Sequence, residues 1–183
     1  MDSFAEQLLK KKNGTKEYAI IALIIVAFLL INGAVMILFP PLLFLVAVGT
    51  AWGAWWLIQT QYIEYEYSVL NGDLDIDCIT GKRKRKRVVQ VRSKKIDDLL
   101  PVTQNLNLQG FQRVLYACTS KETATFYVTY QSKKFGRTIV LMEPNGRVFK
   151  ELFAGQPRNK QLATERACRE AGVEMPKPED VVY

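Results

Sequence analysis

The chain has 183 residues, of which 25 are Lys or Arg and 18 are Asp or Glu, so its net charge is +7. It contains no histidine, which excludes Ser-His and Cys-His nucleophile activation and removes the commonest metal ligand. Its three cysteines, Cys78, Cys118 and Cys168, have no paired spacing and fit a reducing compartment. We therefore expect no enzyme, no cofactor and no bound metal.

The segment Tyr18–Ile63 contains 46 consecutive residues without Asp, Glu, Lys or Arg. A bilayer core is crossed by about 20 apolar residues in a helix, so this segment is too long for one crossing and suits two. Pro40-Pro41 interrupts it, and proline disfavours helix at the residue before it. We predict spans over residues 18–38 and 42–58, which form a transmembrane helical hairpin within residues 18–60.

The charges that flank the hairpin predict its orientation. A basic segment, residues 1–17, precedes it, a second basic run follows it, and the tip between the spans carries no Lys or Arg. The positive-inside rule then places both termini in the cytoplasm of a multi-pass plasma-membrane protein. Aromatic residues at the same ends fit an interfacial belt; they are Tyr18, Trp55, Trp56 and Tyr62.

Two other interpretations of the apolar segment were weighed. A signal peptide is one of them, but its apolar region is shorter and ends in a cleavage site of small residues. Here the apolar run is longer, has no good cleavage site and continues directly into a second span. A buried helical hairpin of a soluble protein would need more apolar material than the remaining chain provides. The membrane interpretation is therefore preferred.

Small residues in the second span form a GxxxG motif at Gly49 and Gly53. Such residues let two helices approach closely, so we expect these glycines to pack against another helix. The first span is the nearer partner, with Gly33 and Ala34 available, and a homodimer is the alternative. Asn32 is the one strongly polar side chain deep in the first span, and no intramembrane charge marks an ion pathway.

A β-hairpin is predicted directly after the spans. The segments Tyr62–Leu70 and Asp73–Thr80 flank Asn71-Gly72, which is the strongest short hairpin signal. With a two-residue turn, both strands place apolar residues on one face and polar residues on the other. The apolar face holds Tyr65, Tyr67, Val69, Leu74, Ile76 and Cys78.

The remaining chain predicts more strands and then helices. Further strands are expected at Arg87–Arg92, Val114–Ser120, Thr125–Gln131 and Arg137–Met142, with a loop over Thr103–Gln112. Ser93 is predicted to cap a short helix that runs through Leu99. The one-face spacing of Val148, Phe149, Leu152 and Phe153 favours a helix, and Asn159–Ala171 predicts another that Gly172 ends. The tail, Val173–Tyr183, is expected to be loose.

These elements predict an α+β fold with a transmembrane hairpin, a small antiparallel β-domain at residues 61–155, and a helix plus tail at residues 156–183. Many antiparallel strands closed by a helix suggest a pleckstrin-homology-like (PH-like) barrel. The segments Glu64–Tyr67, Asn71–Asp77 and Gly81–Arg85 together resemble an uncharacterised family of small bacterial membrane proteins with two spans and a cytoplasmic PH-like domain. The resemblance covers residues 1–153, includes Tyr127–Phe149, and implies no activity and no catalytic residues.

Acidic residues on the first hairpin invite a calcium interpretation, because Asp73, Asp75 and Asp77 lie two residues apart. An EF-hand loop would need glycine and a carboxylate where this chain has Cys78 and Lys84. A strand also arranges these carboxylates along a line rather than around one ion. We therefore do not expect metal binding.

One basic run supplies the excess charge of the domain, and it has two interpretations. Its members are Lys82, Arg83, Lys84, Arg85, Lys86 and Arg87. They can pair with the acidic hairpin face across the sheet, or they can contact anionic lipid, and both can hold if the lysines pair and the arginines face lipid. Nucleic acid is a weaker candidate, because Tyr65 and Tyr67 lie on the apolar face and the chain is tethered to a membrane.

The sequence thus predicts a membrane-anchored scaffold or adaptor at the inner leaflet, oriented by its basic run on anionic headgroups. An exposed strand edge would then bind a peptide. The alternative is an accessory subunit of a membrane enzyme or transporter complex, with the GxxxG face in contact with an integral-membrane partner.

Overall fold

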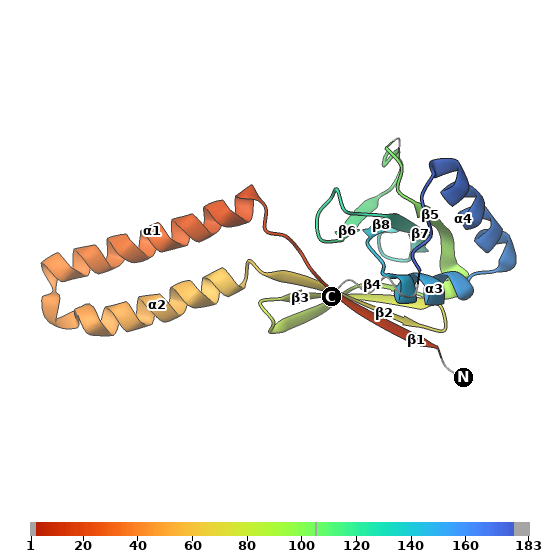
Figure 1. The fold of residues 1–183 in the computed structure, drawn as a ribbon. Helices are drawn as coiled ribbons and strands as arrows, with labels where there is room; N and C mark the ends of the chain where they lie inside the picture. The colour runs from red at the N-terminus through yellow and green to blue at the C-terminus, as the bar shows by residue number, and fades with distance from the viewer. Residues whose placement is uncertain (1–2, 105, 178–183) are drawn as a thin grey trace. The chain divides into compact units, whose positions relative to one another are not determined.

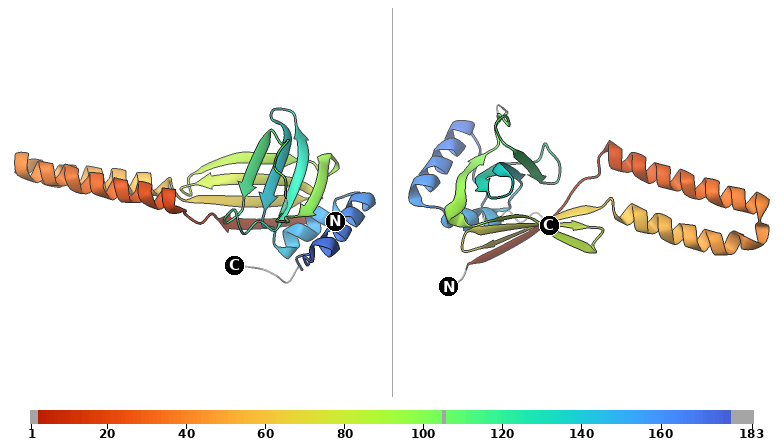
Figure 2. Two further views of the ribbon diagram at one scale, coloured as in Figure 1. Left: turned by 90° about the horizontal axis from the view of Figure 1, so that it is seen from above. Right: turned by 180° about the vertical axis from the view of Figure 1, so that it is seen from behind.

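The computed structural model describes residues 3–104 and 106–177 and has the predicted α+β composition (Figures 1 and 2). The chain divides into two compact units. The helical unit combines Lys12–Glu64 with Ile79–Arg85. The β unit combines Met1–Lys11, Tyr65–Cys78 and Lys86–Tyr183.

Two apolar helices, α1 (Thr15–Leu38) and α2 (Leu43–Gln59), lie side by side in the helical unit, joined by the 3₁₀ helix η1 (Pro40–Leu42) (Figure 1). The predicted break at Pro40-Pro41 is confirmed. At the start of α1, the N–H of the N-cap residue Gly14 donates to the side chain of Glu17 in the first turn, at 2.9 Å from Oε2. Both helices are long and apolar enough to cross a membrane.

No side chain of α1 or α2 is buried by the protein. Near the tip, Ile37 is 81% exposed and Phe44 is 80% exposed. Continuous apolar surface of this extent is rare on proteins that work in water, where it marks a contact with a membrane or another protein. The two helices therefore fit a two-span membrane protein.

Within residues 3–104 and 106–177, eight strands form two four-stranded sheets. The first sheet has the order β1-β2-β3-β4, with β1 at Phe4–Lys10, β2 at Ile63–Leu70, β3 at Asp73–Thr80 and β4 at Lys84–Val91. The second has the order β5-β7-β8-β6, with β5 at Ile96–Pro101, β6 at Arg113–Ala117, β7 at Phe126–Ser132 and β8 at Gly136–Met142. Its β5–β7 and β7–β8 pairs are antiparallel, whereas β6 and β8 are parallel.

Strand β1 lies where no element was predicted, in residues 1–17. Its large apolar residues Phe4 and Leu8 are exposed, whereas Ala5 and Gln7 face the core. The Gln7 side chain donates to the Glu143 carbonyl oxygen at 3.0 Å and accepts from the Asn145 N–H at 2.6 Å. The sequence therefore lacks the usual strand signal of apolar residues inside and polar residues outside. Hydrogen bonds of an inward-facing polar side chain stabilise the strand instead.

The predicted β2–β3 hairpin is confirmed. Asn71 and Gly72 both have positive φ, 51° and 82°, as a type I′ turn requires. Four of the six residues on the predicted apolar face, Tyr67, Val69, Leu74 and Ile76, are fully buried.

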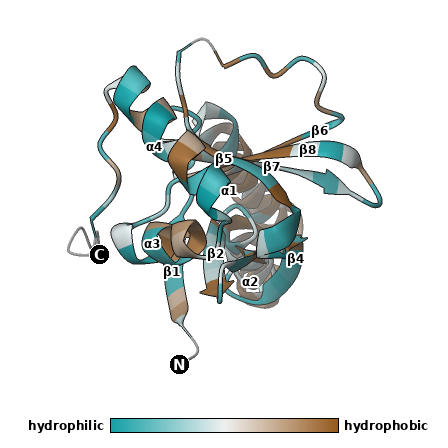
Figure 3. Cartoon of the chain, turned by 90° about the vertical axis from the view of Figure 1, so that its right-hand side faces the viewer, coloured by the Kyte–Doolittle hydropathy of each residue, from teal (hydrophilic) through white to brown (hydrophobic). Residues whose placement is uncertain are grey.

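The core joins this apolar face to the second sheet and to a helix, α3 (Gly146–Ala154). The ring of Phe149 lies 4.5 Å from the ring of Phe126 between centroids. Figure 3 shows hydrophobic and hydrophilic residues next to each other along α3, which buries Val148 and Leu152 as predicted. A second helix, α4 (Arg158–Ala171), ends at Gly172 in the left-handed conformation, which also confirms the prediction.

The helix predicted from Ser93 through Leu99 is wrong. A single 3₁₀ turn, η2 (Ser93–Lys95), leads directly into β5. The pairing of β5 with β7 shifts register between Ile96 and Asp98, as at a β-bulge. The extra residue puts Ile96 and Leu99 on the buried side at a spacing of three, which imitates a helix in the sequence.

The other predicted strands are present with small shifts in their ends, and β4 begins at Lys84 rather than Arg87. The segment between β5 and β6 has no regular structure over its described residues, as predicted for the loop Thr103–Gln112. In the predicted tail, residues 173–177 have no helix or strand, and residues 178–183 lie outside the described part.

Gly72 lies against Gly155 so closely that a Cβ at residue 72 would be 2.5 Å from the Gly155 Cα. We expect Gly72→Ala to lower the free energy of unfolding by about 2–4 kcal/mol, because backbone strain adds to this clash. Gly110→Ala is the matched control, since Gly110 also has positive φ but open space around it; it should lose only about 1 kcal/mol. Denaturation of the detergent-solubilised chain, followed by tyrosine circular dichroism, measures both values. Equal losses would contradict the role of the close contact.

Candidate functional site

The predicted basic run forms the turn between β3 and β4 and the first half of β4, and all six of its side chains are exposed. Its first four residues belong to the helical unit, whereas Lys86 and Arg87 belong to the β unit. Gly81 and Lys82 turn the chain with positive φ angles of 59° and 57°. We call residues 81–85 the basic turn.

The basic turn is fixed against the end of α2. The Gly81 N–H donates to the Tyr62 carbonyl oxygen at 2.8 Å. A Cβ at Gly81 would lie 2.8 Å from the Gln59 carbonyl oxygen, so the backbones meet too closely for any other residue.

Arg83 strengthens this connection through the tryptophans of α2. Its guanidinium carbon lies 5.5 Å from the ring centroid of Trp55 and 5.6 Å from that of Trp56. It also donates to the Trp56 carbonyl oxygen at 3.4 Å. A cation is favoured over aromatic faces and at a helix C-terminus, so both effects hold Arg83 here.

The same end of the helical unit gathers further cations and aromatic rings. Lys12 and Lys16 lie at the start of α1, which neighbours the end of α2 (Figure 1). Exposed aromatic side chains occur at these helix ends; they are Tyr18, Trp55, Trp56 and Tyr62. The opposite end, around η1, carries no charge. This polarity is typical of a span whose charged end lies at a headgroup layer.

Arg87 pairs with the acidic hairpin face, at 3.3 Å from Asp75 and 3.1 Å from Asp77. The expected alternation, in which lysines pair and arginines face lipid, is therefore wrong for Arg87. A guanidinium presents several donors in one plane, which lets it contact two carboxylates at once. Burial raises the pKa of Asp75, and the positive charge of Arg87 opposes that rise.

The remaining carboxylate of the proposed calcium set is also in use, because Asp73 Oδ1 accepts from the Ser93 N–H at 2.8 Å. Among the residues that the structure describes, no three His, Cys, Asp or Glu side chains are grouped as a metal site requires.

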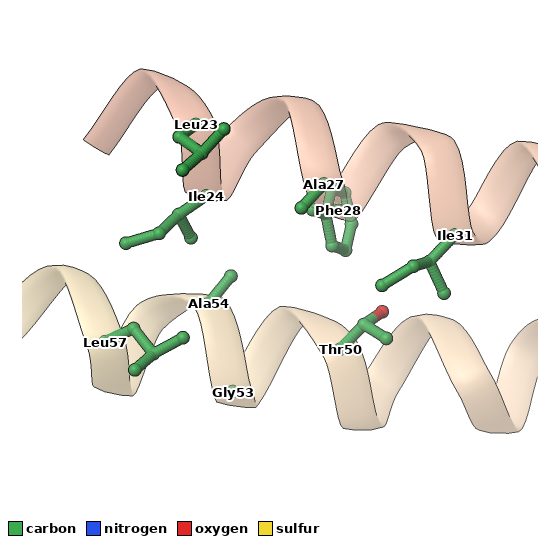
Figure 4. A pocket seen from close by; sticks show the side chains of 9 residues that line it. All are labelled: Leu23, Ile24, Ala27, Phe28, Ile31, Thr50, Gly53, Ala54 and Leu57. Carbon is green, nitrogen blue, oxygen red and sulfur yellow. The ribbon is translucent and has the colours of Figure 1, made fainter. Parts of the chain in front are cut away.

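One glycine of the GxxxG motif, Gly53, lies beside an open groove. A Cβ at Gly49 or Gly53 would meet no atom within 4 Å outside its own helix. Gly53 lines a groove of about 320 Å³ between α1 and α2, together with Ala27 and Ala54 (Figure 4). The helices are joined by a hydrogen bond from Asn32 Nδ2 to Thr50 Oγ1 at 3.0 Å. The packing role of the two glycines stays a prediction.

Three side chains of the β unit that carry a thiol or a phenol, Cys118, Cys168 and Tyr67, are buried. Burial raises the pKa of the Cys118 thiol to about 11 and raises that of Cys168 as well. Burial also raises the pKa of Tyr67, whose hydroxyl donates to the Ala117 carbonyl oxygen and accepts from the Glu143 N–H. Their burial fits a packing role in the core.

Two features of the site have no signal in the sequence. Nothing there pairs Arg83 with the tryptophans, although both were expected near the same interface. A second group of cations lies at the β4–β5 connection, on β6 and in the β7–β8 turn. A search for charge runs does not find this group, because its members are far apart in the chain.

We expect Arg87→Gln to destabilise the fold by about 0.5–1 kcal/mol at neutral pH, because Asp75 loses the cation that favours its ionised form. The folded-state pKa of Asp75 is already above its usual value and should rise further. The destabilisation should therefore fade as the pH drops from the variant's folded-state pKa through the lower folded-state pKa of the unaltered chain, below which Asp75 is protonated in both folded chains. Unfolding measured from pH 3 to pH 7 tests this, with Arg147→Gln on α3 as the control. A loss independent of pH would argue against the charge pairing.

The comparison with known protein families matches residues 1–160 to a family described as "Bacterial PH-like domain (DUF6106)". No curated protein and no solved structure matched the chain. PH-like domains are generally non-catalytic. The match includes β1, both apolar helices, all the other strands and α3. The chain therefore belongs to this family of bacterial PH-like domains.

Proposed function

We propose that this protein is a non-enzymatic scaffold, anchored by α1 and α2 in the plasma membrane with its PH-like domain at the inner leaflet. The basic turn orients the domain by contact with anionic headgroups. The observation that supports this best is the placement of Arg83 on Trp55 and Trp56 at the C-terminal end of α2. A tryptophan pair favours the headgroup layer, so the cations beside it reach the phosphates.

The order of strands supports a hairpin that enters and leaves the bilayer on one side. α1 follows β1, α2 precedes β2, and β1 and β2 are neighbours in one sheet. Two paired strands lie on the same side of a membrane, because a sheet cannot be divided by a bilayer. The helix pair between them therefore crosses an even number of times.

The charge pattern supports a cytoplasmic location for that side. Lys12, Lys16 and the basic turn belong to the helix ends that connect to the sheet, whereas the tip at η1 is uncharged. Positively charged flanks are retained in the cytoplasm. The three buried or half-buried cysteines are free thiols, which suits the same compartment.

The lipid contact is assigned mainly to Lys82 and Lys84, on either side of Arg83. Both are exposed, and both belong to the same unit as the helices. Each cation near an anionic surface contributes about 1 kcal/mol of attraction, which weakens with salt. Arg83 itself holds the turn in place.

We expect the unaltered chain to prefer anionic lipid. The variant Lys82→Gln/Arg83→Gln/Lys84→Gln should lose this preference. The measurement is electron paramagnetic resonance of spin-labelled phosphatidylglycerol and phosphatidylcholine around the full-length protein in bilayers. The preference should fall several-fold in the variant, as removal of about 1 kcal/mol per cation implies, and should weaken with salt.

The matched control for that variant is Arg147→Gln/Lys150→Gln/Arg166→Gln, which removes three exposed cations from α3 and α4. It should leave the lipid preference unchanged. If both triple variants behave alike, the basic turn has no particular lipid role.

The three natural cysteines are first replaced by serine, and Phe39→Cys is added to that chain. We expect this new cysteine to react with a membrane-impermeant maleimide in intact spheroplasts. A cysteine at Lys150 should react only after lysis, because the PH-like domain lies inside. Labelling of Lys150→Cys from outside would reverse the topology and overturn the proposed location.

The alternative role, as an accessory subunit of a membrane complex, is favoured by the open groove beside Gly53. Small residues there would let a third helix approach α2. Purification from native membranes in mild detergent distinguishes the roles, since a stoichiometric integral-membrane partner supports the subunit. Gly49→Leu/Gly53→Leu should then release that partner, or separate two copies if the complex is a homodimer.

A further inference from the structure

A cleft of about 820 Å³ opens in the β unit between the two sheets, away from every residue assigned a role above except Asp73 and Asp75. Its walls come from the start of β3, the end of β4 with η2, the start of β6, and the turn between β7 and β8. Five cations line it: Arg92, Lys95, Arg113, Lys133 and Lys134.

These cations outnumber the acids that line the cleft. Its two carboxylates are already engaged, Asp73 with the Ser93 N–H and Asp75 with Arg87. Within the described residues, Arg92, Lys95 and Lys133 have no acidic side chain within ion-pair distance. The cleft is therefore a region of positive potential, which attracts anions.

Apolar side chains accompany the cations. The Arg113 guanidinium lies 4.1 Å from the ring centroid of Phe135, and the Lys134 ammonium lies 5.3 Å from it. Phe135 is 41% exposed at the tip of the β7–β8 turn, and Val88 lies half-buried on the opposite wall. A ligand that fits this lining has both negative charges and apolar groups.

One wall of the cleft is a free strand edge. Among the strands that the structure describes, β4 is last in its sheet and has β3 as its one neighbour. Val88, Gln90 and Val91 of β4 line the cleft. An exposed strand edge tends to pair with a further strand unless charged side chains prevent it. In β4, lysines occur only in the first half of the strand. The second half, from Val88 onward, presents backbone groups beside the cations.

We propose that this cleft binds an acidic, extended peptide segment of a partner protein, which adds to the edge of β4 as a fifth strand. Its backbone pairs with Val88–Val91. Alternate side chains point to opposite faces, so its carboxylates reach Lys133 and Lys134 while its apolar residues pack near Phe135. The cations lie on separate segments along an extended wall, which fits a chain of carboxylates better than one compact phosphate. This rests on the proposed scaffold function, whose partner site it supplies.

The test uses the full-length protein in detergent micelles and a fluorescein-labelled peptide of about eight residues that alternates Glu and Val, long enough to span the edge. Fluorescence anisotropy should show saturable binding that weakens with salt. A peptide that alternates Lys and Val should not bind. A Glu-Pro peptide should bind poorly, because proline cannot pair with a strand edge. Hydrogen exchange at Val88–Val91 should slow only with the Glu-Val peptide.

Lys133→Glu/Lys134→Glu should weaken the binding of the Glu-Val peptide at least about tenfold, since two attractive contacts become repulsive. Arg147→Glu/Lys150→Glu makes the same charge change on exposed positions of α3 and should leave binding within about twofold. Equal weakening in both variants, or equal binding of the Glu-Pro peptide, would reduce the interaction to general charge attraction and overturn the proposal. No saturable binding of the Glu-Val peptide, or its displacement by inorganic phosphate or phosphatidylglycerol vesicles, would also overturn it.

The two proposals fail separately in these measurements. Lys133→Glu/Lys134→Glu should keep the preference for spin-labelled phosphatidylglycerol, and Lys82→Gln/Arg83→Gln/Lys84→Gln should keep the binding of the peptide. Loss of lipid preference from the cleft variant would assign the cleft to the membrane instead of a peptide. Peptide binding without any lipid preference would remove the lipid role and leave the cleft as the binding site.

Discussion

The constraint on which the rest of the structure depends is the solvent that α1 and α2 require. The protein buries none of their side chains, although nearly every residue between Tyr18 and Ile58 is apolar. Exposed apolar surface in water is unfavourable by about 25 cal/mol per Å². In the proposed membrane setting, lipid removes that cost and fixes the depth of the helix ends, where Trp55 and Trp56 contact Arg83 of the basic turn.

The insertion of this helix pair between two neighbouring strands explains how β1 reaches the sheet. β1 and β2 are separated by more than fifty residues, which would normally make their pairing a slow, long-range event. The helical hairpin brings its own two ends together, so the strands behave as if a short loop joined them. The Gln7 hydrogen bonds to Glu143 and Asn145 then tie β1 to the turn between β8 and α3.

The elements that the sequence predicts correctly are those in which local and long-range preferences agree. The break at Pro40-Pro41, the turn at Asn71-Gly72 and the end of α4 at Gly172 each follow from backbone geometry that few residues allow. β1 and β5 were missed because Gln7 faces inward and because a bulge gives Ile96 and Leu99 a helical spacing. For the candidate site, the basic run was evident, but its contacts depend on Trp55, Asp75 and Asp77, which only the fold brings near.

The charge balance of the domain also has a different meaning in three dimensions. By composition, residues 61–183 would be neutral without the basic run, which suggests a single charged feature. In the structure the run itself divides, since Arg83 stacks on tryptophan and Arg87 neutralises Asp75 and Asp77. The cations of the cleft come from segments that are balanced by acids elsewhere on the surface. A neutral sum is therefore compatible with two positive surfaces, one beside the helix ends and one at the edge of β4, because the acids that balance the total charge lie elsewhere on the domain.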